Sequence, residues 1–172
     1  MFSFNGRLMA NQGERRFSAS LRWSQGEVSR ILLTTPLGQA LASIDVDAGG
    51  ARLTTADGRR YAAGSLSDLA RRGLGLSLPL EHLPWWMSGR DAPGAPATPG
   101  TDGFTQHGWT VRYGTRDARG RPLRIDAECL AACSSGQLPG TRAEMDKTAD
   151  ARPETDPATL RVRLIIDQWL DP

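Results

Sequence analysis

The stretch Phe17-Ser18-Ala19-Ser20-Leu21-Arg22-Trp23 decides the fold class of this chain. Apolar residues take every second position and mostly polar ones lie between them, a pattern typical of a β-strand with one buried face. The same alternation recurs before and after this stretch. We expect further strands over residues 2–9, 28–34, 41–46, 52–55, 59–62, 109–113, 123–127 and 160–169.

Turn signals separate these strands at intervals of about 8 to 12 residues. Asp57-Gly58 predicts a tight hairpin, and Pro36-Leu37-Gly38 predicts a turn with proline at its second position. Such spacing favours an antiparallel sheet whose sequence neighbours are also neighbours in space. Because about nine to eleven strands in one sheet must curl or split, the sequence predicts a mainly β fold, an incomplete and open antiparallel β-barrel.

Two short helices are expected between the strand groups. One begins at Ser65 or Ser67 and ends near Gly73 or Gly75, and the other covers residues 80–88. Residues 91–103 hold three prolines and three glycines, which predicts a loop or linker. We expect the short helices at the open side of the curled sheet to form a lid over an apolar cavity.

The length of 172 residues fits one domain over residues 1–172. Residues 132–158 contain no aromatic residue, no valine and no isoleucine, so we expect them to form a mobile insertion. The 21 basic and 19 acidic residues give a formal net charge of +2, too even for a strong nucleic-acid binder. The apolar runs are all shorter than a helix that crosses a bilayer requires.

The common enzyme motifs are missing from the sequence. Lys147 is the only lysine and follows Asp146, so there is no phosphate-binding GxxxxGK loop. The segment 75–79 resembles GxSxG but lacks the final glycine. His82 and His107 stand apart in sequence without an HExxH neighbour, and a metal site is not expected. We therefore expect no catalytic residues and no cofactor, although a site assembled in space around a histidine stays open.

The two cysteines, Cys129 and Cys133, are four residues apart. This spacing matches neither a zinc-ribbon pair nor a redox CxxC motif. On an extended strand the two would lie too far apart for a disulfide, so a bridge between them requires a bulge or turn.

Tryptophan is the most unusual feature of the composition, with five residues against two tyrosines. Trp23 and Trp109 lie in strand patterns and are expected in the core. Trp85 and Trp86 are adjacent on a short helix, where neighbouring side chains point about 100° apart. We expect one of them to face the core and the other a cavity or lid.

Together these segments resemble the LolB family, the outer-membrane lipoprotein receptors of Gram-negative bacteria. The turn at Pro36, the tryptophan pair before Gly89 and the terminal strand to Trp169 are the most specific parts. The matching segments, in order, are Phe4-Asn5-Gly6-Arg7-Leu8, Phe17-Ser18-Ala19-Ser20-Leu21-Arg22-Trp23, Leu32-Leu33-Thr34-Thr35-Pro36-Leu37-Gly38, Asp57-Gly58-Arg59-Arg60-Tyr61, Leu78-Pro79-Leu80, Leu83-Pro84-Trp85-Trp86-Met87-Ser88-Gly89, Gly108-Trp109-Thr110-Val111-Arg112-Tyr113 and Ile165-Ile166-Asp167-Gln168-Trp169.

The resemblance implies a function without catalysis. Members take acylated lipoproteins from the periplasmic carrier LolA and deliver them, without ATP, to the inner leaflet of the outer membrane. The implied partners are therefore LolA, acylated lipoproteins and outer-membrane phospholipid, with no nucleic acid, and the chain is expected to be a monomer. Members are anchored at the periplasmic face of the outer membrane by a lipidated N-terminal cysteine. This sequence starts at Met1 without such a cysteine, so we expect an anchorless version.

The resemblance also implies roles for residues. Leu37, in the turn with Pro36 and Gly38, would be the exposed apolar residue needed for membrane insertion. Arg22, Arg112 and Arg163 are expected near the mouth of the cavity, where they would meet polar groups of lipoprotein or carrier, or else form solvated surface. Alternation gives the candidates for the acyl-chain cavity, some of which will be plain core: Leu21, Trp23, Leu33, Ile44, Trp85, Trp86, Met87, Trp109, Tyr113, Ile125, Leu164 and Ile166.

Three alternatives remain at this point. A soluble periplasmic lipoprotein carrier, or another lipid-binding protein of the same architecture, would lack the anchor. A non-enzymatic interaction module would have a solid core that admits no acyl chain. A hydrolase would need a triad around His82 or His107.

Overall fold

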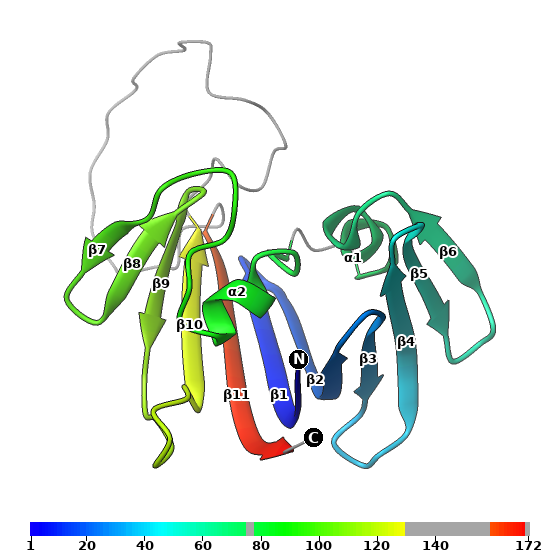
Figure 1. The fold of residues 1–172 in the computed structure, drawn as a ribbon. Coiled ribbons are helices and arrows are strands. Elements are labelled where there is room, and N and C mark those ends of the chain that lie inside the picture. The colour runs from blue at the N-terminus through cyan, green and yellow to red at the C-terminus, as the bar shows by residue number, and fades with distance from the viewer. Residues whose placement is uncertain (75–77, 130–158, 171–172) are drawn as a thin grey trace, which may run out of the picture.

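The computed structural model describes residues 1–74, 78–129 and 159–170. They form one antiparallel sheet of eleven strands that curves without closing into a barrel (Figure 1). Its order is β6-β5-β4-β3-β2-β1-β11-β10-β9-β8-β7, which confirms the expected fold class. The strands are β1 Phe2–Gln12, β2 Arg15–Gln25, β3 Ser29–Thr34, β4 Ala40–Asp47, β5 Gly50–Thr55, β6 Arg60–Ala63, β7 Thr98–Gly100, β8 Gly103–Gln106, β9 Trp109–Tyr113, β10 Arg124–Cys129 and β11 Leu160–Leu170.

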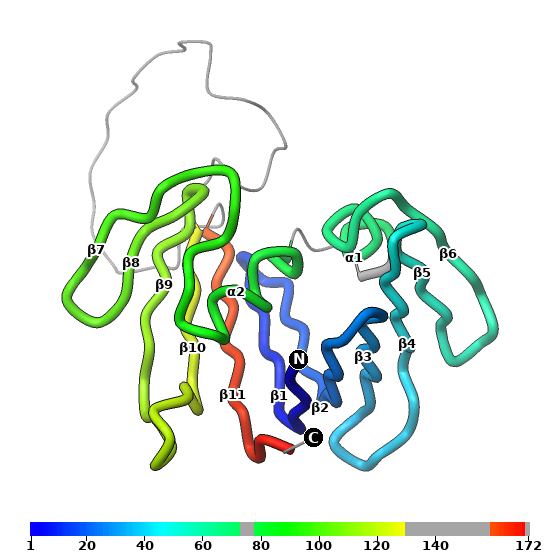
Figure 2. Tube along the Cα trace, in the orientation of Figure 1, coloured from blue at the N-terminus to red at the C-terminus, as the bar shows by residue number. Residues whose placement is uncertain are grey.

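The first and last strands pair at the middle of the sheet, so the start of β1 lies beside the end of β11 (Figure 2). Phe4 of β1 faces Trp23 on one side and Trp169 on the other. The register shifts between Asn5 and Gly6, which marks a β-bulge. A Cβ at Gly6 would lie 2.3 Å from the Ile165 carbonyl oxygen, so only glycine fits there. The bulge bends the sheet at its centre, where the two strand groups meet.

The curvature gives the sheet two faces of opposite character. Side chains at alternate positions of every long strand are buried on the concave face, as Leu21 and Trp23 are in β2. Those between them, such as Arg22, are exposed on the convex face. The inner residues form one continuous core. Burying one face of each strand is what the period-two pattern predicts.

Two helices lie on the concave side of the sheet (Figure 1). Helix α1, Leu66–Leu74, begins where the Ser65 hydroxyl accepts a hydrogen bond from the Asp68 N–H at 3.1 Å. Helix α2, Leu83–Met87, has proline in its first turn and is followed by Gly89 at φ +68°. Neither is long enough or apolar enough to span a membrane, and no other helix occurs in the described residues.

Three sequence expectations concern the loop over residues 91–103, the two cysteines and residues 132–158. The loop expected over residues 91–103 was wrong in part, because β7 forms within it and β8 follows directly. β7 pairs only three residues with β8, so it is too short to show alternation. Cys129, the last residue of β10, is buried and disulfide-bonded, while Cys133 lies outside the described residues. The segment 132–158, expected to be an insertion, also lies outside them.

Candidate functional site

An apolar space lies between the concave face and the segment that leads into α2; we call it the inner chamber. Its free volume is only about 10 Å³, roughly the space of one water molecule. The sheet and the segment before α2 are therefore in contact, and the chamber is closed. Ten apolar side chains line it: Leu8, Leu21, Trp23, Ile31, Leu33, Ile44, Leu78, Leu80, Leu83 and Leu164.

A larger pocket of about 560 Å³ opens beside the inner chamber; we call it the mouth. It lies between α2, the start of α1 and the strand ends that hold Phe2, Gln25 and Ser29. Trp23 and Leu80 line both spaces, so the open mouth and the closed chamber meet at these two side chains. The lining of the mouth is mixed, and we call its polar members the rim, which includes Gln25, Ser29, Asp47, Glu81 and Arg90.

Trp23 is fixed at this boundary by its indole N–H. The N–H donates to the Ser29 hydroxyl at 3.0 Å and to the Gln25 side-chain oxygen at 3.3 Å. Its ring contacts Phe2 and Phe4, with ring centroids 6.3 and 6.2 Å away. Trp23 therefore presents an apolar face to the chamber and keeps its polar edge at the rim, as buried tryptophans commonly do.

A second cluster, the tryptophan block, fills the interior between α2 and strands β8 and β9. It consists of Trp86, Phe104, Gln106, Trp109 and Tyr113, with aromatic centroids 6.1 to 6.4 Å apart. Trp86 is fully buried. Its indole N–H donates to the Gln106 side-chain oxygen at 3.1 Å, and the Tyr113 hydroxyl donates to the Trp86 carbonyl at 2.6 Å. Burial raises the pKa of Tyr113 to about 12, with Arg116 acting in the opposite direction.

Gln106 also holds the loop that follows α2. Its side-chain oxygen accepts from the Ala92 N–H at 2.9 Å, and its amide donates to the carbonyls of Ala92 and Ala95 at 2.7 and 2.6 Å. Buried polar side chains require this degree of pairing, because an unpaired group would keep its desolvation cost. The block is thus held by hydrogen bonds, whereas the inner chamber is lined by apolar side chains.

The two histidines stack on each other at the edge of the block. The rings of His82 and His107 are 4.4 Å apart and nearly parallel, and His107 Nε2 lies 3.0 Å from the Pro93 carbonyl oxygen. Burial lowers the pKa of His82, the neighbouring His107 lowers it further, and Glu81 partly offsets both. In the described residues this pair connects the start of α2 to the turn between β8 and β9.

The structure divides the twelve residues predicted to line a cavity into four groups. Leu21, Trp23, Leu33, Ile44 and Leu164 line the inner chamber, and Trp85 lines the mouth. Trp86, Trp109 and Tyr113 belong to the tryptophan block, while Met87, Ile125 and Ile166 are buried core. The adjacent tryptophans do point apart, since Trp86 is buried and Trp85 is 43% exposed.

Sequence reasoning missed five lining residues: Leu8, Ile31, Leu78, Leu80 and Leu83. Leu8 and Ile31 occupy inward positions of β1 and β3, so alternation could have found them. The three leucines of residues 78–83 lie outside any strand. Their close spacing, Leu-Pro-Leu-Glu-His-Leu, was the available signal.

Leu37 lies at the tip of the turn between β3 and β4 and is 89% exposed. The Gly38 N–H donates to the Thr35 carbonyl at 2.9 Å, and the Thr35 N–H donates to the Gln39 carbonyl at 2.8 Å. Pro36 and Gly38, the latter at φ +84°, suit a tight turn closed by a left-handed residue. Ser29, at the other end of β3, lines the mouth. Leu37 therefore lies a strand length, about 20 Å, from the mouth.

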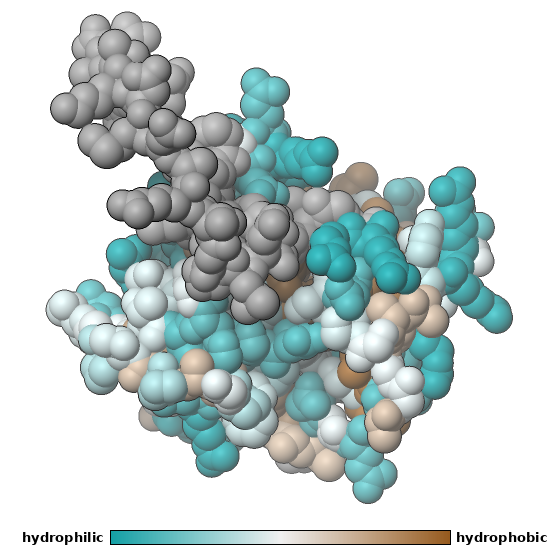
Figure 3. Space-filling view, turned by 90° about the horizontal axis from the view of Figure 1, so that it is seen from above, coloured by the Kyte–Doolittle hydropathy of each residue, from teal (hydrophilic) through white to brown (hydrophobic). Residues whose placement is uncertain are grey.

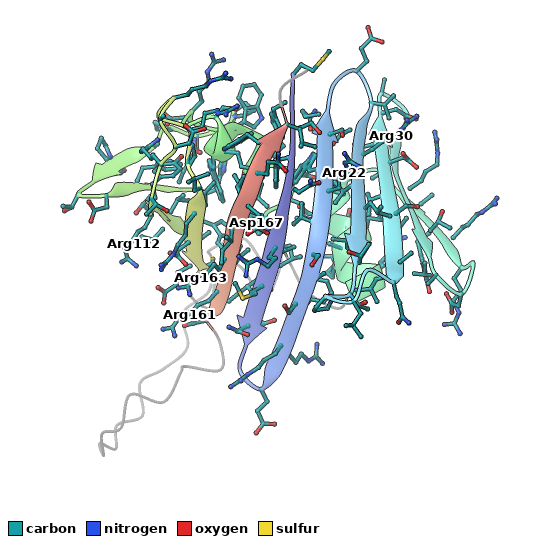
Figure 4. All side chains as sticks on the ribbon, turned by 90° about the horizontal axis from the view of Figure 1, so that it is seen from below. Arg22, Arg30, Arg112, Arg161, Arg163 and Asp167 are labelled. Atoms are coloured by element: carbon teal, nitrogen blue, oxygen red, sulfur yellow. The ribbon has the colours of Figure 1, made fainter. Side chains whose placement is uncertain are left out.

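The arginines expected near the mouth are placed elsewhere. Arg22, Arg112 and Arg163 lie on the convex face (Figure 4), because each alternates with an inward-facing neighbour. The mouth instead has Arg90 on its rim. Seen from the opposite side, hydrophilic side chains cover most of the surface, and hydrophobic ones show only in small areas between them (Figure 3).

Comparison with known proteins agrees with this geometry. The family model described as "Outer membrane lipoprotein LolB" matches residues 1–169. The chain belongs to the LolB family. Proteins named "Outer-membrane lipoprotein LolB" include one from Azoarcus sp., 32% identical over 98% of this chain and 77% of its own length. One from Chromobacterium violaceum is 37% identical over 74% of this chain and 72% of its own length.

Membership in the LolB family places the protein at the outer membrane. In the described parts of the chain, no group of three or more His, Cys, Asp or Glu side chains converges as metal ligands do. The features that remain are an apolar interior, an open mouth and the highly exposed Leu37.

Proposed function

We propose that this LolB-family protein accepts acylated lipoproteins from the periplasmic carrier LolA and inserts them into the inner leaflet of the outer membrane. One observation carries the proposal: an all-apolar chamber lies directly behind an open mouth, and the two spaces meet at Trp23 and Leu80. Acyl chains would enter the chamber, and the polar part of the lipoprotein would stay at the rim.

The energetics require such a shelter. Each methylene of an acyl chain is worth about 0.8 kcal/mol, so a chain of roughly fifteen would cost ~12 kcal/mol to leave in water. Handover requires only that the next site bind somewhat better, because about 1.4 kcal/mol already biases exchange tenfold. No ATP and no covalent chemistry are needed, which agrees with a sequence that lacks nucleotide-binding and catalytic motifs.

The chamber must expand to admit a chain. Its free volume of about 10 Å³ is that of a closed state. Leu78, Leu80 and Leu83 line it from the segment before α2, and the sheet provides the opposite wall. We propose that movement of this segment away from the sheet opens the chamber, because apolar contacts can be exchanged for acyl-chain contacts at little cost.

Leu37 would act after acceptance. An exposed leucine enters the membrane interface at little cost, whereas a charged residue does not. The hydrogen-bonded turn fixes the leucine at the outermost position of its hairpin. The twenty-ångström separation from the mouth, estimated from the strand rise, gives acceptance and insertion different surfaces of the same molecule.

A transfer assay tests the proposal. The purified chain is mixed with LolA that carries an acylated lipoprotein, and the protein with which the lipoprotein elutes is identified. The same lipoprotein without acyl chains is the control. We expect only the acylated form to move to this chain. No movement, with a chain shown to be folded, would contradict the proposal and favour a module with a solid core.

A substitution at Leu37 separates the two steps. Leu37→Glu should keep the fold and the acceptance of acylated lipoprotein, because the side chain is almost fully exposed. Transfer from the variant into liposomes should fall, since a carboxylate is costly in the membrane interface. Gln39→Glu, in the same turn and exposed, adds the same charge as a control. Equal insertion rates for Leu37→Glu and the parent chain would refute the role of Leu37.

A further inference from the structure

The convex face of the sheet is more basic than the chain as a whole. Among the described strands, alternation places ten arginines and five carboxylates on this face, an excess of five positive charges, whereas the whole chain has a net charge of +2. Figure 4 shows Arg112, Arg161 and Arg163 on one half of this face and Arg22 and Arg30 on the other. The arginines are Arg7, Arg16, Arg22, Arg30, Arg52, Arg60, Arg112, Arg124, Arg161 and Arg163, and the acids are Asp45, Asp47, Asp126, Glu128 and Asp167.

Seven of the ten arginines are ion-paired to these five carboxylates, because Asp126 and Glu128 each hold two of them. Asp126 accepts from Arg124 Nε at 2.7 Å and from Arg163 Nε at 2.5 Å, so two guanidinium groups share one acid. Glu128 accepts from Arg161 at 3.3 Å and lies 3.9 Å from Arg112. Because Arg124 and Arg163 bind Asp126 through Nε, their terminal nitrogens are left for an external acceptor. Phosphate oxygens suit such forked donors.

We propose that this convex face docks on the anionic phospholipid headgroups of the outer membrane, with the mouth turned away from the bilayer. The inference rests on the proposed function, since the helices and the mouth lie on the concave side (Figure 1). A carrier bound to the convex face could not reach the mouth. A bilayer on that face leaves the mouth free for the carrier.

The composition of the face also favours a lipid surface over a protein partner. Stable protein interfaces have an apolar, often aromatic core with a polar rim. On the convex face Leu32 is the only large apolar side chain that is more than one-third exposed among the described residues. Dispersed positive charge with few apolar groups is what attracts a protein to an anionic leaflet, and this attraction is sensitive to salt.

Vesicle binding tests the inference. The chain is mixed with phosphatidylethanolamine vesicles that contain about 30% phosphatidylglycerol, and with zwitterionic phosphatidylcholine vesicles, and the bound fraction is measured by flotation. We expect binding only to the anionic vesicles, and loss of most of it between about 0.1 and 0.5 M salt. Equal binding to both kinds of vesicle would overturn the inference.

A pair of double variants locates the surface. Arg22→Gln with Arg163→Gln removes two convex arginines and should lower the affinity for anionic vesicles about tenfold or more. Arg71→Gln with Arg72→Gln removes the same charge from exposed positions on α1 and should change it little. Equal loss in both pairs would mean that net charge alone governs binding and would contradict docking by the convex face.

Lipoprotein acceptance is measured without vesicles, so that the proposed function is tested separately from the docking of the convex face. Both double variants should accept acylated lipoprotein from LolA as the parent chain does, which also shows that they are folded. If the convex variant loses acceptance but keeps vesicle binding, the face is a protein-docking surface and the lipid inference is wrong. If the parent chain binds anionic vesicles through this face but accepts no lipoprotein, the proposed function is wrong and the docking inference stands.

Discussion

The two sides of the interior differ in how their side chains are held. In the tryptophan block, Trp86 and Gln106 are tied to each other, and Gln106 is also tied to the loop after α2. The inner chamber is lined by apolar side chains, and among them Trp23 is held by a hydrogen bond from its indole N–H to the Ser29 hydroxyl. Both sides are closed, but only one is closed by contacts that an acyl chain could replace.

We infer from this difference that one region holds α2 in place and the other moves when a ligand enters. Hydrogen-bonded buried groups have one satisfied arrangement, and moving them leaves donors or acceptors unpaired. Apolar contacts are not directional, so leucines can separate and contact a ligand instead. The tryptophan block would therefore anchor α2 to the sheet, while the segment from Leu78 to Leu83 yields to the ligand.

The largest expected effect on stability comes from truncating Trp86, which anchors α2 to the sheet. Trp86→Ala removes a fully buried side chain and should lower the free energy of unfolding by about 3–5 kcal/mol. Trp85→Ala is the matched control, since Trp85 is half-exposed and should cost less than about 1 kcal/mol. Urea unfolding of the two variants measures this. Similar losses would show that the two tryptophans are equivalent and that α2 has no special anchor.

The next effect tests the hydrogen bonds alone. Gln106→Leu keeps the volume of the side chain but leaves the Trp86 and Ala92 N–H groups without their acceptor. The expected loss is about 2–3 kcal/mol, the cost of unpaired buried groups. Gln39→Leu, at an exposed position, should stay within about 0.5 kcal/mol. A neutral Gln106→Leu would mean that packing holds the block.

Overpacking the chamber should affect function more than stability. Leu33→Trp inserts a larger ring among the chamber leucines and should cost about 1–3 kcal/mol. It should also reduce acceptance of acylated lipoprotein, because the ring takes the place of the chain. Trp109→Phe in the block should cost a similar amount and leave acceptance unchanged. Full acceptance by Leu33→Trp would exclude the chamber as the acyl-chain site.

The smallest effect concerns pH and the histidine stack. Burial lowers the pKa of His82 in the folded protein from its usual 6.5, so the unfolded chain binds this proton first. The contribution of His82 to the free energy of unfolding is therefore fully present above pH 6.5. It declines as the pH falls from there toward the lowered pKa of the folded state. His82→Gln should reduce the decline between about pH 7 and pH 5, measured by urea unfolding. An unchanged pH dependence would show that the stack carries no such penalty.

Much of the fold could be predicted from local patterns. Alternation in β2, β9 and β11 defined inward and outward residues correctly, because burial of one face follows directly from strand geometry. The turn at Leu37 was also predictable, since Pro36 and Gly38 suit only a few backbone conformations. β7 was not, because a three-residue strand with a proline is formed by pairing with β8 and not by its own sequence.

The site was harder to predict. Trp86 and Leu33 are both inward-facing apolar residues, and no local pattern shows that one is tied to Gln106 while the other lines the chamber. That distinction depends on contacts between residues far apart in the chain, such as the 20 residues between Trp86 and Gln106. The same reason explains why Arg22 and Arg163 were expected at the mouth. Alternation places these arginines on the face opposite the core. Only the curvature of the sheet shows that this face is the convex one, away from the mouth.

The five tryptophan indole N–H groups allow the division of the interior to be measured directly by NMR. The chain, labelled with ¹⁵N at tryptophan, is titrated with an acylated lipoprotein and, as a control, with its non-acylated form. We expect the acylated form to shift the signals of Trp23 and Trp85, which line the mouth, while Trp86 stays hydrogen-bonded to Gln106 and unshifted. A shift of Trp86 with Trp23 unchanged would contradict the division of the interior into a fixed block and a yielding chamber.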